Sequence, residues 1–465
     1  MRVAASLALG AFVLVACASD YGSDDPSASD PGADGGASSS GNGKGDGGSS
    51  GNGEGGVIPG KPITVSGKIV SYGVGMPNVP VVVGGKTAVN TSALGTFSVP
   101  DVTPPYDVSF ALKTNDSQPR VTVYKGLTRP DPTLIALGAT AELRPTPTQA
   151  TSLSGTITGA SGPGWARAPV VGFAGPNRAT GSVVVDMATG AYTMKGTDGP
   201  LWFGATSITG TLHAGLVLDN ASPVTAFYGK LPNVNVSGGA TITDKTIALQ
   251  SVPVGVINAK VTAPARYTDA TKMILLAAIR YEESAGYFLR STNLPFPVDV
   301  KRFVPLVNGG VFQMVAGYQA GGDGESSFAR AATEPAATAE LSVALADPPQ
   351  HTEPADGAKG VARSTPFTFT AFANGIHRFV FIANNQPSIT IITASTSVTL
   401  PDLAPFAITI PSDVEYTWRV AGYRPITSMD ADELAQFMSP PDGVLPNIER
   451  GEYALSAARK VTLAP

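Results

Sequence analysis

Residues 63–113 read ITVSGKIVSYGVGMPNVPVVVGGKTAVNTSALGTFSVPDVTPPYDVSFALK, and this stretch decides the fold. Short runs in which apolar and polar residues alternate are separated by Gly, Pro or Asn. Alternation with a period of two places the apolar side chains on one face of a strand, and the breakers mark the turns. The stretch therefore predicts a series of short β-strands that bury one face in a common core.

A second stretch repeats the landmarks of the first. Residues 151–175 restart with TSLSGTITGASGPGWARAPVVGFAG, so that Ser66-Gly67 recurs as Ser154-Gly155. The next landmark of the first stretch, GTFSV at residues 95–99, is echoed by GAYTM at residues 190–194. We infer one sandwich plan that is used twice, with an insertion in the second use.

The first stretch resembles the carboxypeptidase regulatory-like, or prealbumin-like, β-sandwich of secreted bacterial proteins. The resemblance rests on VSGKI, PNVPVVV, LGTFSV and YDVSF, and it covers about 50 residues. These motifs are structural, with glycines at turns and alternating apolar residues that fill a core. The resemblance implies a module without a catalytic centre.

Composition extends the β prediction to the whole chain. A chain of 465 residues is too long to fold around a single hydrophobic core, and its length predicts three or four domains of roughly 100 residues. Its 53 Gly and 39 Pro interrupt helices of ordinary length but leave room for strands of about five residues. We predict an all-β fold of tandem β-sandwich modules that follow a signal peptide and a disordered Gly/Ser/Asp tether.

The last part of the chain has its own pattern. Apolar residues recur with period two at 367–370, 379–381, 389–391 and 416–420, which places Trp418 in a core. The motifs PADG, TPFTFT, LPDL and YTWRVAGY resemble a fibronectin type III or Ig-like sandwich. The predicted division is signal peptide 1–16, linker 17–61, carboxypeptidase regulatory-like sandwich 62–147, second sandwich of similar plan 148–250, third β module 251–347 and fibronectin III/Ig-like sandwich 348–465.

Two segments leave room for a helix. Residues 273–279 form a continuous apolar run that periodicity cannot assign, and we favour a buried hairpin over a helix for residues 272–290. Near the C-terminus, Asp430 is a candidate N-cap with Glu433 three residues later, followed by Leu434, Phe437 and Met438 on one face. This pattern predicts a short surface helix.

The N-terminus has the pattern of an export signal. Arg2 precedes an apolar run that extends to Ala16 and is too short to span a membrane permanently. The sequence Leu-Val-Ala-Cys at residues 14–17 resembles the lipobox of bacterial lipoproteins. That resemblance implies cleavage between Ala16 and Cys17, diacylglycerol on the Cys17 sulfur, and a membrane partner reached through this lipid. Ala18 after the cysteine indicates the outer membrane.

The tether explains most of the charge. Residues 18–56 carry seven Asp or Glu against Lys44 alone, whereas the net charge of the chain is −5. This tract has no aliphatic residue larger than Ala, so it cannot bury enough surface to fold, and we predict disorder. The remaining chain is close to neutral and offers no basic stripe, which argues against nucleic acid as a partner.

Residues that could carry chemistry are sparse. The three histidines, His213, His351 and His377, have no paired spacing, and with Cys17 assigned to lipid they predict no metal site and no cofactor. Carboxylates at Glu282-Glu283 and near residue 430 are accounted for by a turn and a helix cap. Trp165 and Trp202 lie in turn-rich stretches and are the candidates for a ligand-binding aromatic face.

These patterns favour a non-catalytic, lipid-anchored envelope protein whose sandwiches act as spacer or interaction modules, with another envelope protein as a partner. The alternative is a polysaccharide-binding surface lipoprotein, for which Trp165 and Trp202 would supply the contact. An enzyme on a β scaffold is the least favoured interpretation, because two carboxylates from distant positions can form a glycoside hydrolase site without a local motif.

Overall fold

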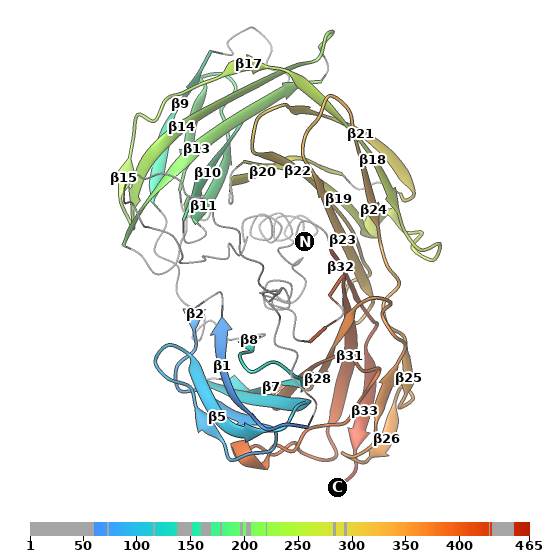
Figure 1. The fold of residues 1–465 in the computed structure, drawn as a ribbon. Coiled ribbons are helices and arrows are strands. Elements are labelled where there is room, and N and C mark those ends of the chain that lie inside the picture. The colour runs from blue at the N-terminus through green and yellow to red at the C-terminus, as the bar shows by residue number, and fades with distance from the viewer. Residues whose placement is uncertain are drawn as a thin grey trace, which may run out of the picture.

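The structure is a computed structural model. It describes residues 60–71, 74–114, 117–136, 151–159, 169–176, 179–195, 199–200, 206–219, 221–281, 285–292, 295–426, 428–429 and 451–465. Within these residues the chain is nearly all β, and the helices are two 3-10 turns, η2 (Ala270–Lys272) and η3 (Ala404–Phe406). The predicted all-β fold of tandem sandwiches is confirmed (Figure 1). Among the described residues, no helix is long and apolar enough to cross a membrane.

One strand arrangement occurs three times, and we call these occurrences copies 1, 2 and 3. In copy 1, β1 (Ile63–Ser71) pairs antiparallel with β5 (Thr96–Val102) and with the short β2 (Val74–Gly75), and parallel with β8 (Thr133–Ile135). The strands of the other sheet of this sandwich, which we call the facing sheet, follow the order β4-β3-β6-β7. Their bounds are Val89–Asn90, Pro80–Val83, Tyr106–Thr114 and Ser117–Leu127.

Copy 2 has the same pairing pattern. Its first strand, β9 (Ser152–Thr158), pairs antiparallel with β12 (Ala191–Met194) and parallel with β15 (Thr241–Ile242) and β16 (Ile247–Ala248). The facing sheet has the order β11-β10-β13-β14-β17. The bounds are Ala179–Val184, Val170–Gly175, Ser207–Leu218, Thr225–Ser237 and Gln250–Val252.

Copy 3 follows the plan again. Here β18 (Val254–Thr262) pairs antiparallel with β21 (Val298–Pro305) and parallel with β24 (Ala339–Ala344). The facing strands have the order β20-β19-β22-β23, with bounds Ala285–Thr292, Met273–Tyr281, Gly310–Gln319 and Ser326–Thr333. Because β19 and β20 pair antiparallel, the hairpin predicted for residues 272–290 is confirmed.

A glycine two residues before a buried isoleucine marks the first strand of every copy. The pairs are Gly67 with Ile69, Gly155 with Ile157, and Gly255 with Ile257, and each Ile is buried. A side chain does not fit at these glycines, since a Cβ on Gly155 would lie 1.9 Å from the Lys245 carbonyl oxygen. The neighbouring parallel strand can therefore approach the backbone closely.

Copies 1 and 2 also share their register. Gly67 lies opposite Phe97, and Gly155 lies opposite Tyr192, so an aromatic ring covers each glycine. The isoleucine amide two residues later donates a hydrogen bond to the carbonyl oxygen of a turn glycine that has a positive φ. The pairs are Ile69 with Gly95 in copy 1 and Ile157 with Gly190 in copy 2. The repeat inferred from the sequence thus corresponds to the same hydrogen bonds in both copies. The repeated Gly-x-Ile is the signal that extends the repeat to copy 3.

The strands β25 to β33, which we call the C-terminal unit, form a different sandwich. One sheet has the order β25-β27-β30, with bounds His351–Glu353, Phe367–Phe369 and Ser397–Val398. The other contains β28, β29, β31, β32 and β33, and β33 pairs parallel with β26. Their bounds are Ile376–Ile382, Ser388–Thr393, Glu415–Arg424, Gly451–Leu455, Arg459–Leu463 and, for β26, Ala358–Val361.

The C-terminal unit joins copies 1 and 3 in one sheet. On one side β29 pairs parallel with β7, and on the other side β32 pairs antiparallel with β23. Within the described residues, 14 strands therefore form a single sheet (Figure 1). Twelve of them follow the path β20-β19-β22-β23-β32-β31-β28-β29-β7-β6-β3-β4, and β33 and β26 are attached to it through β31. Strands from three of the predicted module ranges belong to this one sheet. The predicted boundaries between the modules stay a prediction.

The hydrophobic cores follow the sheets and cross between units. The core of copy 1 includes Ile392 and Tyr423 of the C-terminal unit, and the core of the C-terminal unit includes Val121 and Val123 of β7. Trp418 is fully buried in the latter core, as its alternation predicts. Copies 2 and 3 have their own cores between their two sheets. The strands β7 and β29 are thus buried on both faces, between these two cores.

Candidate functional site

A polar groove lies on the outer face of copy 1. Its volume is about 490 Å³, and it extends over β1, β5, β8 and the β4 region. Strand alternation explains its lining, because Val65, Phe97 and Val99 face the core while their neighbours face outward. The outward side chains that line it are Ser66, Lys68, Asn90, Ser92, Thr96, Ser98, Asp131 and Thr133.

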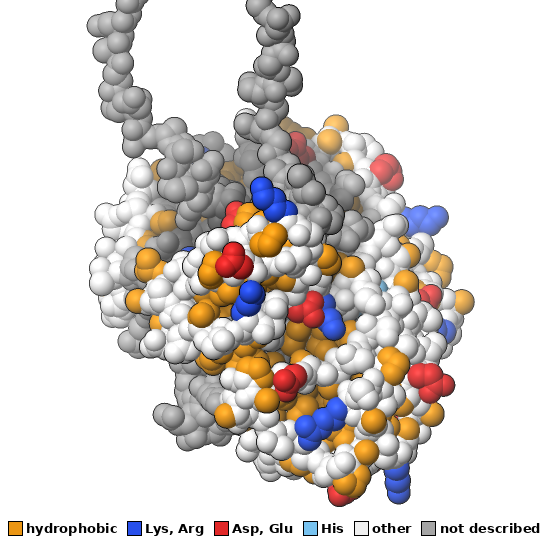
Figure 2. Space-filling model, turned by 60° about the horizontal axis from the view of Figure 1, so that its bottom comes forward, with side chains coloured by type: hydrophobic (Ala, Val, Ile, Leu, Met, Phe, Trp, Pro, Cys, Tyr) orange, Lys and Arg blue, Asp and Glu red, His pale blue; other side chains and the backbone are white. Residues whose placement is uncertain are grey.

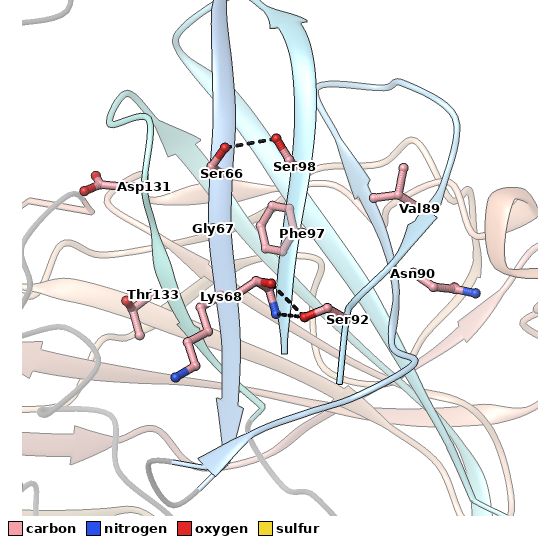
Figure 3. Close-up of a pocket in the computed structure, with 11 residues that line it drawn as sticks. Ser66, Gly67, Lys68, Val89, Asn90, Ser92, Phe97, Ser98, Asp131 and Thr133 are labelled. Atoms are coloured by element: carbon pink, nitrogen blue, oxygen red, sulfur yellow. Dashed lines mark hydrogen bonds between the residues drawn. The ribbon is translucent and has the colours of Figure 1, made fainter. Parts of the chain in front are cut away.

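Hydroxyl groups of the groove form pairs. Ser66 Oγ lies 3.0 Å from Ser98 Oγ across β1 and β5, and Ser92 Oγ lies 2.7 Å from Thr96 Oγ1. Figure 3 shows Ser66 and Ser98 pointing toward each other, with Lys68 and Thr133 on the side of β8. A hydroxyl can both donate and accept, so this lining is suited to ligands that carry many hydroxyls or amides.

The groove has one charge of each sign. Lys68 is half-buried, and Asp131 is exposed in an ion pair with Arg129, whose Nε lies 2.9 Å from Asp131 Oδ1. The hydrogen bond from the Arg129 side chain lowers the pKa of Asp131 below its usual value, so the carboxylate stays charged near neutral pH. The site is therefore polar and close to neutral.

The sequence-predicted binding and lipidation residues lie outside the described part of the chain. This holds for Trp165 and Trp202, and for Ala16 and Cys17. The predicted helix that begins at Asp430 also lies outside it. Sequence alone does not predict the groove, because single Ser and Thr residues on outward strand positions are ordinary surface composition.

His213 and His377 make contacts that stabilise the fold. His377 lies in β28 and its Nε2 accepts a hydrogen bond from the Phe372 amide at 2.9 Å, while burial lowers its pKa. His213 lies in β13, 2.7 Å from the Tyr228 hydroxyl and stacked on Tyr281 of copy 3. As the strand pattern predicts, both belong to strands; His213 in addition stacks across the contact between copies 2 and 3.

His351 forms a pair with a serine that sequence reasoning missed. Its Nε2 lies 3.0 Å from Ser456 Oγ, although the two residues are far apart in sequence. Burial, followed by the charge of Arg459, lowers the pKa of His351 to about 4, so its ring is neutral at pH 7. Ser456 is only 2% exposed and its Oγ also accepts the Val420 amide, so a substrate could not reach it. The pair supports the junction of β25, β31 and β32.

Charged side chains are sparse on the face of the molecule shown in Figure 2. Figure 2 shows Lys, Arg, Asp and Glu scattered, a few of them as neighbours of opposite sign, among apolar and uncharged side chains on the face formed by copy 1 and the C-terminal unit. A search of the described residues finds no group of three or more His, Cys, Asp or Glu arranged to hold a metal ion.

Comparison with known proteins assigns no family to the chain. No family profile matches the chain, and no curated protein matches it. Among solved structures, a candidate adhesin from Bacteroides ovatus is 11% identical, with 39% of this chain and 75% of that one covered and a TM-score of 0.14.

Two further structures are of related kinds. A tetra-tandem repeat from the extending region of a large adhesion protein is 12% identical, with 79% and 96% coverage and a TM-score of 0.13. The pilus adhesin SpaC from Lactobacillus rhamnosus GG is 10% identical, with 80% and 52% coverage and a TM-score of 0.14. TM-scores this low establish no common fold, so these likenesses carry no argument about function.

Proposed function

We propose that the protein is a non-catalytic, lipid-anchored envelope protein that holds a rigid β body at the cell surface for interaction with other surface molecules. The observation that carries this proposal is the continuous sheet through copy 1, the C-terminal unit and copy 3. Sandwiches joined by flexible linkers move independently, whereas strands paired edge to edge and buried on both faces form one body. Such a body keeps a binding surface in a fixed position.

The finer assignment of the units is part of this proposal. The pairing pattern of copies 1 to 3 supports prealbumin-like sandwiches. In the C-terminal unit, the Tyr416 hydroxyl at the start of β31 donates to the Pro411 carbonyl at 3.1 Å. A tyrosine whose hydroxyl bonds back to the backbone a few residues upstream is typical of Ig-like sandwiches, and it supports this assignment.

Lipid on Cys17 supplies the anchor in this proposal. One acyl chain gives marginal membrane binding, and two or more give stable anchoring. Replacing Cys17 with Ser should move the protein from the outer-membrane fraction to the soluble fraction, as measured by immunoblotting after ultracentrifugation. A variant that stays with the membrane would refute lipid anchoring and would leave the rigid-body proposal standing.

A polysaccharide ligand is the second candidate, and the hydroxyl-lined groove of copy 1 is the observation that favours it. Glycan-array binding by the wild type is the first requirement, and no binding to any glycan would eliminate this candidate. If binding occurs, a Lys68→Ala/Ser98→Ala double variant should lose it, while Thr209→Ala, which removes an exposed hydroxyl of copy 2, should not. Loss in Trp165→Ala or Trp202→Ala instead would assign the site to those aromatics.

A further inference from the structure

The residue that follows the repeated glycine of the first strand differs among the three copies. In copy 1 it is Lys68, which lies opposite Thr96 of β5 and lines the groove. In copies 2 and 3 it is Thr156 and Val256. Because the pairing of the first strand follows one plan in all three copies, the fold does not require a lysine at this position. The cation of copy 1 therefore calls for an explanation other than the fold.

Lys68 supplies the charge that a ligand in the groove would meet. The lining is neutral in total, but its negative charge, on Asp131, is already paired with Arg129 at 2.9 Å. The Lys68 ammonium pairs with no carboxylate of the described residues. Because this side chain is half-buried, its charge is screened less than it would be in bulk water. The groove therefore favours a ligand that carries an anionic group.

The turn before β5 leaves the Thr96 hydroxyl as a hydrogen-bond donor. Ser92 Oγ accepts hydrogen bonds from the amides of Leu94 and Thr96, at 3.2 Å each. A hydroxyl oxygen has two lone pairs, so Ser92 gives its own proton to Thr96 Oγ1, which lies 2.7 Å away. The Thr96 proton is then available to a ligand. Since directly opposite residues have Cβ atoms about 5 Å apart, Lys68 and Thr96 can donate to the same small anionic group.

Further hydroxyls surround this pair of donors. Thr133 of β8 lies opposite Lys68 in the parallel ladder, so hydroxyls flank the lysine on both neighbouring strands (Figure 3). Two residues along the same outward face, Ser66 and Ser98 form their pair at 3.0 Å. One proton is used within that pair, and the other proton and the free lone pairs remain for a ligand. The cation thus lies within a row of groups that can both donate and accept.

This combination selects one class of ligand. A neutral sugar would use the hydroxyls and leave the ammonium of Lys68 unpaired, whereas a simple anion would use the ammonium and leave the row of hydroxyls. A uronic acid unit carries a carboxylate and several hydroxyls on one ring, so it matches both. The groove volume of about 490 Å³ is typical of small-ligand sites. Because the groove lies on the outer face of the sheet, a polymer can continue beyond it.

We propose that the groove of copy 1 binds an acidic polysaccharide. Lys68 and Thr96 hold the carboxylate of one uronic acid unit, and the surrounding Ser and Thr hydroxyls bind the hydroxyls of the sugar. This inference rests on the polysaccharide candidate described above, and it specifies the charge of the ligand and the residues that recognise it.

Paired polymers test the carboxylate directly. The probes are polygalacturonate, alginate and hyaluronan, each compared with its carboxyl-reduced form by titration calorimetry on the full chain. The wild type should bind at least one charged polymer, and it should bind that polymer at least tenfold more tightly than the reduced form. Equal affinity for both forms would overturn the proposed carboxylate contact and leave polysaccharide binding standing. Binding to none of the charged polymers would also overturn the inference, while neutral glycans on the array would still test the polysaccharide candidate.

Substitutions in copy 1 test the proposed contacts. Lys68→Gln should weaken binding of the charged polymer about tenfold, and Thr96→Val should weaken it at least threefold, because each change removes one donor. Lys86→Gln is the matched control, since Lys86 is an exposed lysine of the same copy outside the lining of the groove. All three variants should keep the wild-type unfolding temperature. Wild-type affinity in Lys68→Gln or in Thr96→Val, or an equal loss in Lys86→Gln, would contradict this assignment.

Discussion

The joint between copy 1 and the C-terminal unit can be tested at Ile391. This residue is 1% exposed in β29, and it lies opposite Val123 of β7 in the parallel ladder. Its side chain belongs to the same core as Val121 and Val123. The Ile391→Ala change therefore removes packing from both units at once.

The expected cost follows from the atoms removed. Ile→Ala deletes three carbons at about 0.8 kcal/mol each, and the residual cavity adds to this, for a total of about 2–5 kcal/mol. If β7 and β29 open as one unit, even 2 kcal/mol corresponds to about thirtyfold faster exchange of the β7 amides. We expect this acceleration at Val121–Tyr124, although the mutation lies in a different unit.

Hydrogen exchange with mass spectrometry provides the assay, and Leu212→Ala is the matched control. Leu212 is fully buried in the core of copy 2, so its loss should accelerate exchange in β13 and leave β7 unchanged. The reasoning is refuted if Ile391→Ala leaves β7 at the wild-type rate, because copy 1 would then fold independently of the strand beside it. Equal acceleration by both variants would also refute it.

Three further perturbations have defined outcomes. Tyr416→Phe should lower the free energy of unfolding by about 1 kcal/mol in urea titrations, because it removes the hydrogen bond to Pro411. Gly155→Ala should cost about 1–3 kcal/mol in the same assay, since the new Cβ meets a backbone carbonyl. The unfolded chain binds a proton on His351 near pH 6.5, and the folded chain binds it near pH 4. Stability should therefore decrease as the pH is lowered from about 6.5 to about 4, and His351→Gln should make this decrease smaller.

Local pattern predicted much of the fold because strands and turns are specified by nearby residues. The repeat landmarks, the hairpin of β19 and β20 and the burial of Trp418 all follow from alternation and breakers. In copy 3 the alternation is hidden in β19, because Met273–Ile279 is a continuous apolar run. The Gly-x-Ile motif at Gly255 survives there because close backbone packing requires it.

The joining of the units could not be predicted from the same patterns. The β7 strand reads SQPRVTVYKGL and β29 reads SITIIT, and more than half of the chain separates them. Any half-buried strand with alternating residues has the same appearance, and backbone hydrogen bonds carry no residue code that selects a partner. The groove of copy 1 was equally hidden, since its hydroxyls come from four separate segments.

The outer edge of the facing sheet is paired with a different strand in each of the three copies. In each copy the last strand of the facing sheet, namely β7, β14 or β23, would leave unpaired backbone groups at its outer side. An uncovered edge of this kind promotes pairing with other molecules. In copy 2 the short β17 pairs with β14, whereas β29 and β32 of the C-terminal unit pair with β7 and β23. The C-terminal unit thus protects two edges with one sheet, and the same contacts fix copies 1 and 3 relative to each other.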